Sequence, residues 1–281
     1  MQDFTPPLGT SKEELDTPAF LVDLDLMENN MEHMAAYCRS KSLNLRPHTK
    51  HHKCPIIAKR QIQSGAIGIC CQKLGEAETM AANGIDDILI TYEIIGSLKI
   101  RRLVNLAKTT HIAVTVDHPD NVSDFSDAAS AAKVSLGILL DVNVGQNRCG
   151  IEPDKSVIEL ARVVEKSPGL KFLGIHAYNG TIQSVEDFNK RKTLDAESME
   201  KTLTAIKHLQ SADIACDVVT AGGTGTYNMT GSYPYITEIQ PGSYVFMDAQ
   251  YSRVLDDFGN SGTLLATVIS RPTKDRLVVD C

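Results

Sequence analysis

The sequence has no apolar run of the roughly 20 residues needed to cross a bilayer. It has no excess of positive charge either: 28 Lys and Arg stand against 35 Asp and Glu, for a formal net charge of −7. A nucleic-acid or anionic-membrane partner is therefore not expected. The polar, acidic N-terminus lacks the apolar core of a signal peptide. Because the seven cysteines are also an odd number, we expect reduced thiols and a cytoplasmic location.

Between residues 43 and 240, short apolar runs alternate with longer amphipathic stretches. Eight runs are predicted strands: Leu43–Pro47, Ala66–Cys71, Asp87–Thr91, Ile112–Asp117, Ser135–Asp141, Lys171–Ala177, Ala215–Thr220 and Ile236–Gln240. Predicted helices between them include Leu74–Ala82, Leu98–Ala107, Lys155–Glu165 and Val185–Leu209. This alternation is typical of a parallel sheet covered by helices. Eight strands in this length favour a closed (β/α)8 barrel, although a doubly wound sheet would alternate in the same way.

The two ends of the chain do not follow this alternation. Asp16–Asp25 is a predicted strand ahead of the barrel, and Leu264–Ser270 and Arg276–Asp280 are predicted strands with no helix between them. We therefore expect three parts: an N-terminal segment (1–28) that adds a strand to a β-domain, a barrel (29–246), and the start of a C-terminal β-domain (247–281). Since no turn follows the last predicted strand, we expect the sequence to be part of a longer protein.

Active sites of such barrels form at the C-terminal ends of the strands, and glycine-rich segments follow the last two predicted strands. Gly222, Gly223 and Gly225 allow backbone N–H groups to approach a ligand, and Thr224 adds a hydroxyl. For one such loop taken alone, a tight turn is the better explanation. Two glycine-containing loops side by side, the second with Gly242 and Ser243, favour a phosphate site.

A basic cluster, Arg46–Cys54, follows the first predicted strand. Its histidines and Cys54 could form a metal site, although their spacing matches no standard zinc pattern. It could equally be a solvated basic loop. A third interpretation makes one lysine a Schiff-base nucleophile, with a pKa lowered by burial and by neighbouring cations. The cluster alone leaves all three open.

Several segments together resemble a known family. Arg46–Lys53 resembles the cofactor-lysine motif of fold-type III pyridoxal-phosphate enzymes, in the branch of D-threonine aldolase, 3-hydroxy-D-aspartate aldolase and D-serine dehydratase. The similarity continues, in order, through Asp16–Asp25, Cys71–Glu78, Gly145–Gly150, Gly222–Tyr227 and Gln240–Asp248. It covers nearly the whole chain. The resemblance implies an alanine racemase-type barrel that binds pyridoxal 5′-phosphate, followed by a β-domain.

The resemblance also implies roles for individual residues. Lys50 would be the catalytic residue that holds the cofactor as a Schiff base, and Lys53 would be structural. The implied cofactor-binding set is Lys50, Gln72, Arg148 (near the phenolic oxygen), Tyr178 (beside the pyridine ring), Gly222, Gly223, Thr224, Gly242 and Ser243 (at the phosphate), and Gln240. Gln240 stands where alanine racemase has an arginine against the pyridine nitrogen. A neutral amide there would leave that nitrogen unprotonated and the ring a weaker electron sink.

The reaction implied by the resemblance is cleavage of a D-3-hydroxy amino acid, D-threonine or 3-hydroxy-D-aspartate, to glycine and an aldehyde. A divalent metal, Mn or Mg, would act on the substrate hydroxyl. Its ligands are expected beyond residue 281, so no metal ligand is assigned in this chain. A homodimer is expected, since in this fold the partner's β-domain usually completes the site.

Other functions remain open at this point. The same-family alternative is a D-serine or 3-hydroxy-D-aspartate dehydratase that releases ammonia, while racemisation fits the motifs around Lys50 and Gln240 less well. A non-catalytic pyridoxal-phosphate carrier and a metal-dependent barrel hydrolase are hypotheses from other classes. The segment after Met247 argues against the carrier, because carriers lack a β-domain.

Overall fold

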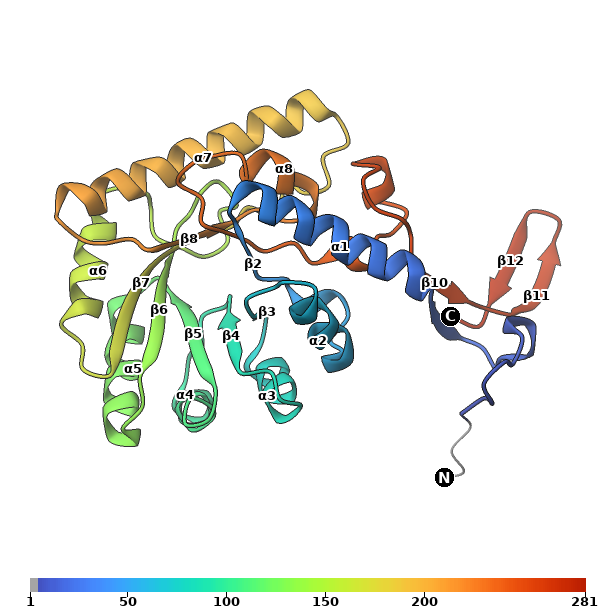
Figure 1. Ribbon diagram of the computed structural model, residues 1–281, viewed down its shortest axis with the longest axis horizontal. Coiled ribbons are helices and arrows are strands. Elements are labelled where there is room, and N and C mark those ends of the chain that lie inside the picture. Colours follow the sequence, from blue (N-terminus) through green and yellow to red (C-terminus); the bar gives the residue numbers. More distant parts are fainter. Residues whose placement is uncertain (1–4) are drawn as a thin grey trace.

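The computed structural model describes residues 5–281, and its centre is one eight-stranded parallel sheet (Figure 1). The strands run in the order β2-β9-β8-β7-β6-β5-β4-β3. The first and last strands of this order meet through backbone hydrogen bonds, Ile67 N to Leu45 O (2.9 Å) and Cys70 N to Pro47 O (2.8 Å). The sheet therefore curls into a barrel, and the predicted (β/α)8 fold is confirmed.

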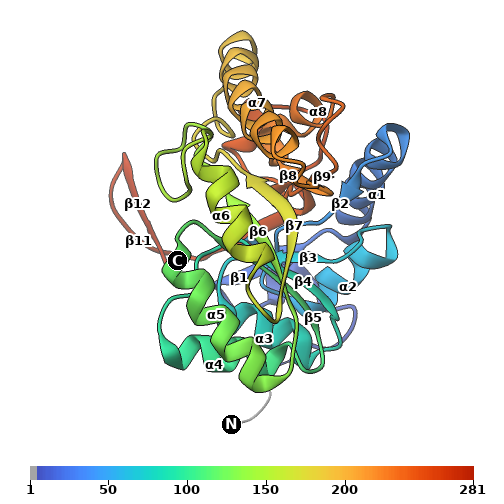
Figure 2. The same cartoon turned by 90° about the vertical axis from the view of Figure 1, so that its left-hand side faces the viewer.

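The barrel strands are β2 (Asn44–Leu45), β3 (Ile69–Cys71), β4 (Asp87–Ile90), β5 (His111–Val116), β6 (Leu136–Asp141), β7 (Leu170–Ala177), β8 (Val218–Ala221) and β9 (Glu238–Ile239). The helices are α1 (Leu24–Lys41), α2 (Pro55–Gln63), α3 (Leu74–Ala82), α4 (Ser97–Leu106), α5 (Pro119–Ala132), α6 (Ser156–Glu165), α7 (Phe188–Ser211) and α8 (Tyr227–Thr230). Figure 2 shows α3 to α6 on the outside of the strands.

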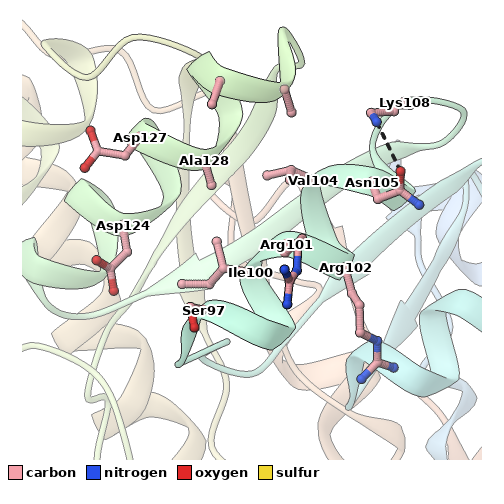
Figure 3. A pocket seen from close by; sticks show the side chains of 12 residues that line it. Ser97, Ile100, Arg101, Arg102, Val104, Asn105, Lys108, Asp124, Asp127 and Ala128 are labelled. Atoms are coloured by element: carbon pink, nitrogen blue, oxygen red, sulfur yellow. Dashed lines mark hydrogen bonds between the residues drawn. The ribbon is translucent and has the colours of Figure 1, made fainter.

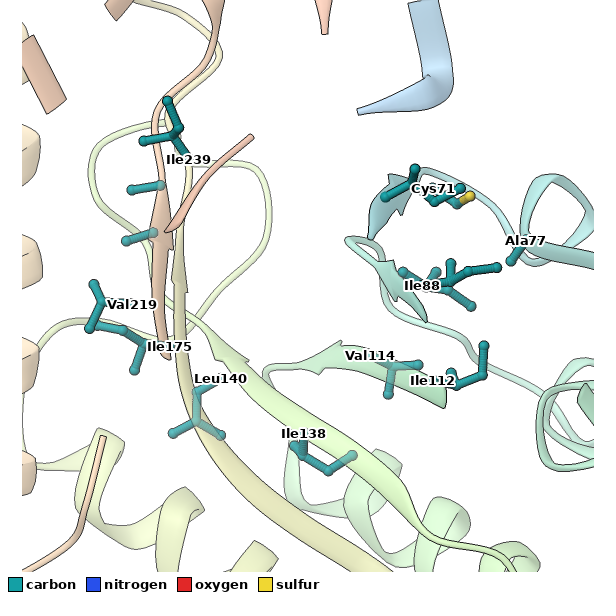
Figure 4. Packing of buried hydrophobic residues seen from close by; sticks show 14 of the residues in the cluster. Cys71, Ala77, Ile88, Ile112, Val114, Ile138, Leu140, Ile175, Val219 and Ile239 are labelled. Atoms are coloured by element: carbon teal, nitrogen blue, oxygen red, sulfur yellow. The ribbon is translucent and has the colours of Figure 1, made fainter. Parts of the chain in front are cut away.

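The strands are apolar on both faces because both faces are buried. Successive side chains alternate between the faces: Ile88 and Ile138 join the large core between strands and helices, and their neighbours Leu89 and Leu139 form a small cluster with Cys70 inside the barrel. Figure 4 shows part of the large core, in which β-branched side chains from successive strands point toward the helices. This packing fixes the end of each strand, and thereby the residues that reach the barrel rim.

Two small antiparallel pairs lie beside the barrel (Figure 1). β1 (Ala19–Val22) pairs with β10 (Gly262–Leu265), and β11 (Val268–Thr273) pairs with β12 (Arg276–Val279). The predicted strand Leu264–Ser270 is therefore two strands, with a break between β10 and β11. The domain boundaries at residues 28 and 246 stay a prediction.

Local signals shift some element ends from their predicted places. The predicted strand Asp16–Asp25 ends early, because the Asp23 side chain caps α1 by accepting a hydrogen bond from Leu26 N (3.0 Å). The long helix predicted over Val185–Leu209 begins at Phe188, because Asp187 accepts from Lys190 N (2.7 Å). Within residues 5–281, no helix is both long and apolar enough to span a membrane.

Candidate active site

Two cavities that share Lys50, Tyr178 and Gln240 lie at the C-terminal ends of the barrel strands. One, of about 190 Å³, is lined by His48, Lys50, Gln72, Thr91, Tyr92, Arg148, His176, Tyr178 and Gln240. The other, of about 50 Å³, is lined by Lys50, His51, Tyr178, Gly223, Thr224, Gln240, Gly242, Ser243 and Tyr251. Nine of the ten predicted site residues line these cavities. The tenth, Gly222, lies behind them, where an added Cβ would be 3.0 Å from Thr230.

Lys50 sits in a 3-10 turn, Thr49–His51, directly after β2. Its Nζ lies 5.2 Å from the centroid of the Tyr178 ring. Although Lys50 is exposed at the cavity mouth, the surrounding protein hinders its hydration and lowers the pKa of its ammonium, and the positive charge of Arg148 lowers it further. A lysine with a lowered pKa is more often the neutral amine, which is the nucleophilic form.

His48 holds this turn in place and is neutral. Its Nδ1 accepts a hydrogen bond from Lys50 N (3.3 Å), and its Nε2 lies 3.0 Å from Thr91 Oγ1. Burial, followed by the charge of Lys50, lowers the pKa of His48 well below its ordinary value. An accepting Nδ1 requires the proton on Nε2, which donates to Thr91.

His52, in the same basic cluster, has a structural role. His52 Nδ1 accepts from Cys54 N (3.0 Å), and its Nε2 lies 3.2 Å from Gln61 Oε1. Burial lowers the pKa of His52 to about 4. Within residues 5–281, the ligand atoms of this cluster do not converge as a metal site requires. The metal interpretation of Arg46–Cys54 is therefore not supported.

The two glycine loops form a cradle of backbone donors. The N–H groups of Gly223, Thr224, Gly242 and Ser243 have no protein acceptor in the part of the chain that the structure describes. Thr224 Oγ1 accepts from Tyr244 N (3.1 Å), so its own hydroxyl hydrogen remains available. A Cβ at Gly242 would lie 2.8 Å from His48 O, which explains the glycine there. This arrangement of free N–H groups suits a phosphate.

A buried chain of polar side chains crosses the barrel beneath the cavities. Asp141 Oδ1 and His176 Nδ1 are 2.7 Å apart, and His176 Nε2 lies 3.3 Å from Gln240 Oε1. Gln240 Nε2 donates to Thr220 Oγ1 (2.7 Å), which donates to Glu238 Oε1 (2.7 Å). The predicted site did not include Asp141 or His176. Their one sequence signal is their place at the ends of β6 and β7, which many barrel residues share.

Glu93, in the loop after β4, lies beside Asp141. Burial and the charge of Asp141 raise the pKa of Glu93 to about 7, and its Oε1 is buried without a hydrogen-bond partner in residues 5–281. Ligand atoms of Glu93, Asp141 and Cys149 lie within 4.8 Å of one another. Asp141 Oδ1 is already hydrogen-bonded to His176 Nδ1. We therefore assign no metal to these three side chains.

Replacing Glu93 by glutamine should stabilise the protein above neutral pH. The folded state holds the Glu93 proton up to about pH 7, whereas an unfolded glutamate releases it near its ordinary pKa of 4.5. The wild type therefore loses stability as pH rises through this window, and Glu93→Gln does not. After allowance for solvent screening, we expect a gain on the order of 1–2 kcal/mol in the free energy of unfolding at pH 8 relative to pH 4.5.

Urea unfolding at several pH values measures this difference. Glu197, which is exposed on α7, provides the matched surface variant Glu197→Gln, measured at the same pH values. An effect of Glu93→Gln that stays constant from pH 4.5 to 8 would contradict a raised pKa.

A larger hollow of about 840 Å³ lies between α4 and α5 on the outside of the barrel (Figure 3). Arg101 and Arg102 on α4 and Asp124 and Asp127 on α5 lie along it. It contains none of the predicted site residues. Its size alone does not make it a catalytic site.

Comparison with known proteins places these observations in one family. The model of the family described as alanine racemase, N-terminal domain, matches residues 22–250. A D-threonine aldolase from Arthrobacter sp. is 39% identical over 276 residues, which cover 97% of this chain and 73% of that protein. A 3-hydroxy-D-aspartate aldolase from Paracoccus denitrificans (strain Pd 1222) is 35% identical, with coverage of 97% and 73%.

Two further relatives have 40% and 26% sequence identity to this chain. The crystal structure of D-threonine aldolase from Filomicrobium marinum superposes with a TM-score of 0.92 at 40% identity, covering 95% of this chain and 73% of that one. A D-threo-3-hydroxyaspartate dehydratase from Delftia sp. (strain HT23) is 26% identical over 241 residues, or 83% of this chain and 62% of that protein. Among these four, the aldolases are more similar to this chain than the dehydratase is.

Proposed function

The chain belongs to the alanine racemase N-terminal domain family, and from this premise we propose that it is a pyridoxal-phosphate-dependent lyase. The proposed reaction cleaves a D-3-hydroxy amino acid, D-threonine or 3-hydroxy-D-aspartate, to glycine and an aldehyde. The main observation that supports this proposal is that Lys50, Tyr178, Gln240 and the two glycine loops line two adjoining cavities. The greater identity to aldolases, 35–40% against 26% for the dehydratase, favours the retro-aldol reaction.

The residues of the cavities fit pyridoxal phosphate. The cofactor has an aldehyde, which an amine can capture, and Lys50 offers an amine with a lowered pKa. It has a phosphate, and Gly223, Thr224, Gly242 and Ser243 offer N–H groups that have no acceptor within residues 5–281. It has a flat ring, and Tyr178 lines both cavities. When bound, the cofactor supplies an electron sink that lets a bond to the substrate Cα break.

In the proposed mechanism the protein binds, orients and moves protons. Lys50 Nζ would hold the cofactor and later exchange with the substrate amine. Arg148, whose charge already depresses the pKa of Lys50, would also neutralise the phenolic oxygen, and Gln72 lines the same cavity. Burial raises the pKa of Tyr178 well above its usual value, which keeps its hydroxyl neutral. Gln240 would face the ring nitrogen.

Replacing Thr224 by valine should weaken cofactor binding about tenfold. The valine keeps the side-chain shape but removes the hydroxyl that would donate to the phosphate, and such a charge-assisted hydrogen bond contributes about 1.5 kcal/mol. Titration of the apoprotein with pyridoxal phosphate, followed by visible absorbance, measures the change. Thr224→Ser is the matched control, since its hydroxyl can still accept from Tyr244 N. Equal affinities of the two variants would contradict a phosphate contact by this hydroxyl.

The metal and the quaternary structure are further parts of the proposal. A divalent cation, Mn or Mg, would polarise the hydroxyl of the substrate. The family resemblance supplies this expectation, and the ligands are expected outside residues 1–281. A homodimer stays a prediction on the same ground.

The second candidate is a dehydratase on the same Lys50 scaffold, favoured by the similarity to the D-threo-3-hydroxyaspartate dehydratase. The two reactions differ in products. Protein supplied with pyridoxal phosphate and manganese would be incubated with D-threonine, D-serine and 3-hydroxy-D-aspartate, and glycine and ammonia quantified together. Glycine without ammonia supports the aldolase. Ammonia without glycine makes the protein a dehydratase. If neither glycine nor ammonia is formed, both candidate functions are overturned.

A further inference from the structure

We propose that His176 is a doubly protonated imidazolium which locks Gln240 and places a fixed positive charge next to the amide facing the cofactor's ring nitrogen. This rests on the proposed function for the identity of the cofactor, but the charge of His176 is a property of the protein alone. His176 is 1% exposed and Gln240 3% exposed, and protein atoms supply the hydrogen-bond partners of both side chains. The charge can therefore be derived from the partners of each buried group.

The derivation starts at the far end of the polar chain. Glu238 is 2% exposed and receives Arg46 Nε at 2.8 Å, so it is an ionised acceptor. Thr220 must therefore donate its one hydroxyl hydrogen to Glu238, and its oxygen accepts from Gln240 Nε2. This fixes the orientation of the amide. Gln240 Oε1, which can only accept, then faces His176.

Acceptors now lie on both sides of the imidazole. Nε2 must carry a hydrogen to reach Gln240 Oε1, and a second hydrogen must lie between Nδ1 and Asp141 Oδ1, which are 2.7 Å apart. An imidazole is a stronger base than a carboxylate by more than two pKa units. The second proton therefore belongs to His176, and Asp141 is its buried counter-ion.

The charge has a consequence for the proposed cofactor site. Gln240 uses Oε1 for His176 and one Nε2 hydrogen for Thr220, and a half-turn of the amide would break both bonds. The remaining Nε2 hydrogen would be donated to a ring nitrogen that carries no proton. A proton on the ring nitrogen would place a second positive charge close to the imidazolium, and the two charges would repel each other. His176 is thus a positioning residue that acts through Gln240.

Other charged or titratable side chains surround this pair. They are His48 and Lys50 from the turn after β2, Glu93 from the loop after β4, Asp141 at the end of β6, Arg148 from the following loop and Tyr178 after β7. Lys50 and Arg148 add positive charge to the cavity. Of these six side chains, Asp141 is the one that is hydrogen-bonded to His176.

Nitrogen-15 NMR of protein labelled at histidine tests the charge directly, with or without the cofactor. We expect both ring nitrogens of His176 to be protonated at pH 8, and only one ring nitrogen of His48, its neighbour in the cavity, at the same pH. The His176→Gln variant assigns the signals. In Asp141→Asn, His176 should become neutral at pH 8 while His48 is unchanged. One protonated nitrogen on His176 in the wild type at pH 8 would overturn the proposal.

The second arm uses the holoprotein with pyridoxal phosphate labelled at the ring nitrogen. In His176→Gln and Asp141→Asn the ring nitrogen should take up a proton at a pH at least one unit higher than in the wild type, a tenfold gain in proton affinity. Unchanged titration in both variants would overturn the electrostatic role. Failure of the wild type to bind the cofactor would instead overturn the proposed function, while the histidine spectra would still decide the charge of His176.

Discussion

Lys50→Ala should lower the catalytic rate by a factor of at least about 10³ and abolish covalent attachment of the cofactor. Among the described residues 5–281, Lys50 is the one lysine that lines both cavities, and its pKa is lowered by its surroundings. Alanine has no nucleophile, so pyridoxal phosphate could bind only through its phosphate and ring. Borohydride reduction followed by peptide mass spectrometry measures the attachment, and the two-product assay measures the rate.

Lys53 is the matched control, three residues further along the same basic segment. Its Nζ lies 3.4 Å from Glu76 Oε1, and its side chain is largely exposed. Lys53 is not among the residues that line either cavity. Lys53→Ala should keep the reduced adduct on the peptide carrying Lys50 and keep the rate within about twofold, as for an exposed ion pair. If the adduct were found on Lys53, or survived in Lys50→Ala, the assignment of the cofactor lysine would be wrong.

The barrel was predictable because most of its strands have a recognisable local sequence pattern. Runs such as Asp87–Ile90 and Leu136–Asp141 are apolar on both faces, which indicates a buried parallel strand without any knowledge of its neighbours. Short strands were less predictable. β2 is only Asn44–Leu45, because the chain turns into the Lys50 segment as soon as it has paired with β9.

The site was predictable where it depends on local backbone chemistry. The glycines of the two loops and the basic segment around Lys50 could be located from the order of residues. The polar chain under the cavities could not, because Asp141, His176 and Gln240 come from three different strand ends. Their hydrogen bonds depend on register and barrel closure, and a polar residue at the end of a barrel strand is ordinary. The charge of His176 emerges only when every partner is known.

Gly225→Ala should destabilise the protein and weaken cofactor binding together. A Cβ at Gly225 would lie 2.0 Å from the backbone oxygen of Gln183, and the Gly225 N–H donates to Gln183 Oε1 (3.0 Å). Backbone atoms cannot rotate away as a side chain would, so the loop that carries Gly223 and Thr224 must move. We expect a loss of about 3 kcal/mol in the free energy of unfolding, which lowers Tm by roughly 6–12 °C for a chain of this size.

Thermal unfolding of the apoprotein and cofactor titration separate the two effects. A Cβ added at Gly75, at the start of α3, would have no neighbouring atom within 4 Å. Gly75→Ala should therefore leave cofactor affinity unchanged and leave Tm unchanged or slightly raised. A Gly225→Ala protein with wild-type Tm and wild-type affinity would show that this loop tolerates displacement. The close approach of Gly225 to Gln183 would then not be what holds the phosphate cradle in shape.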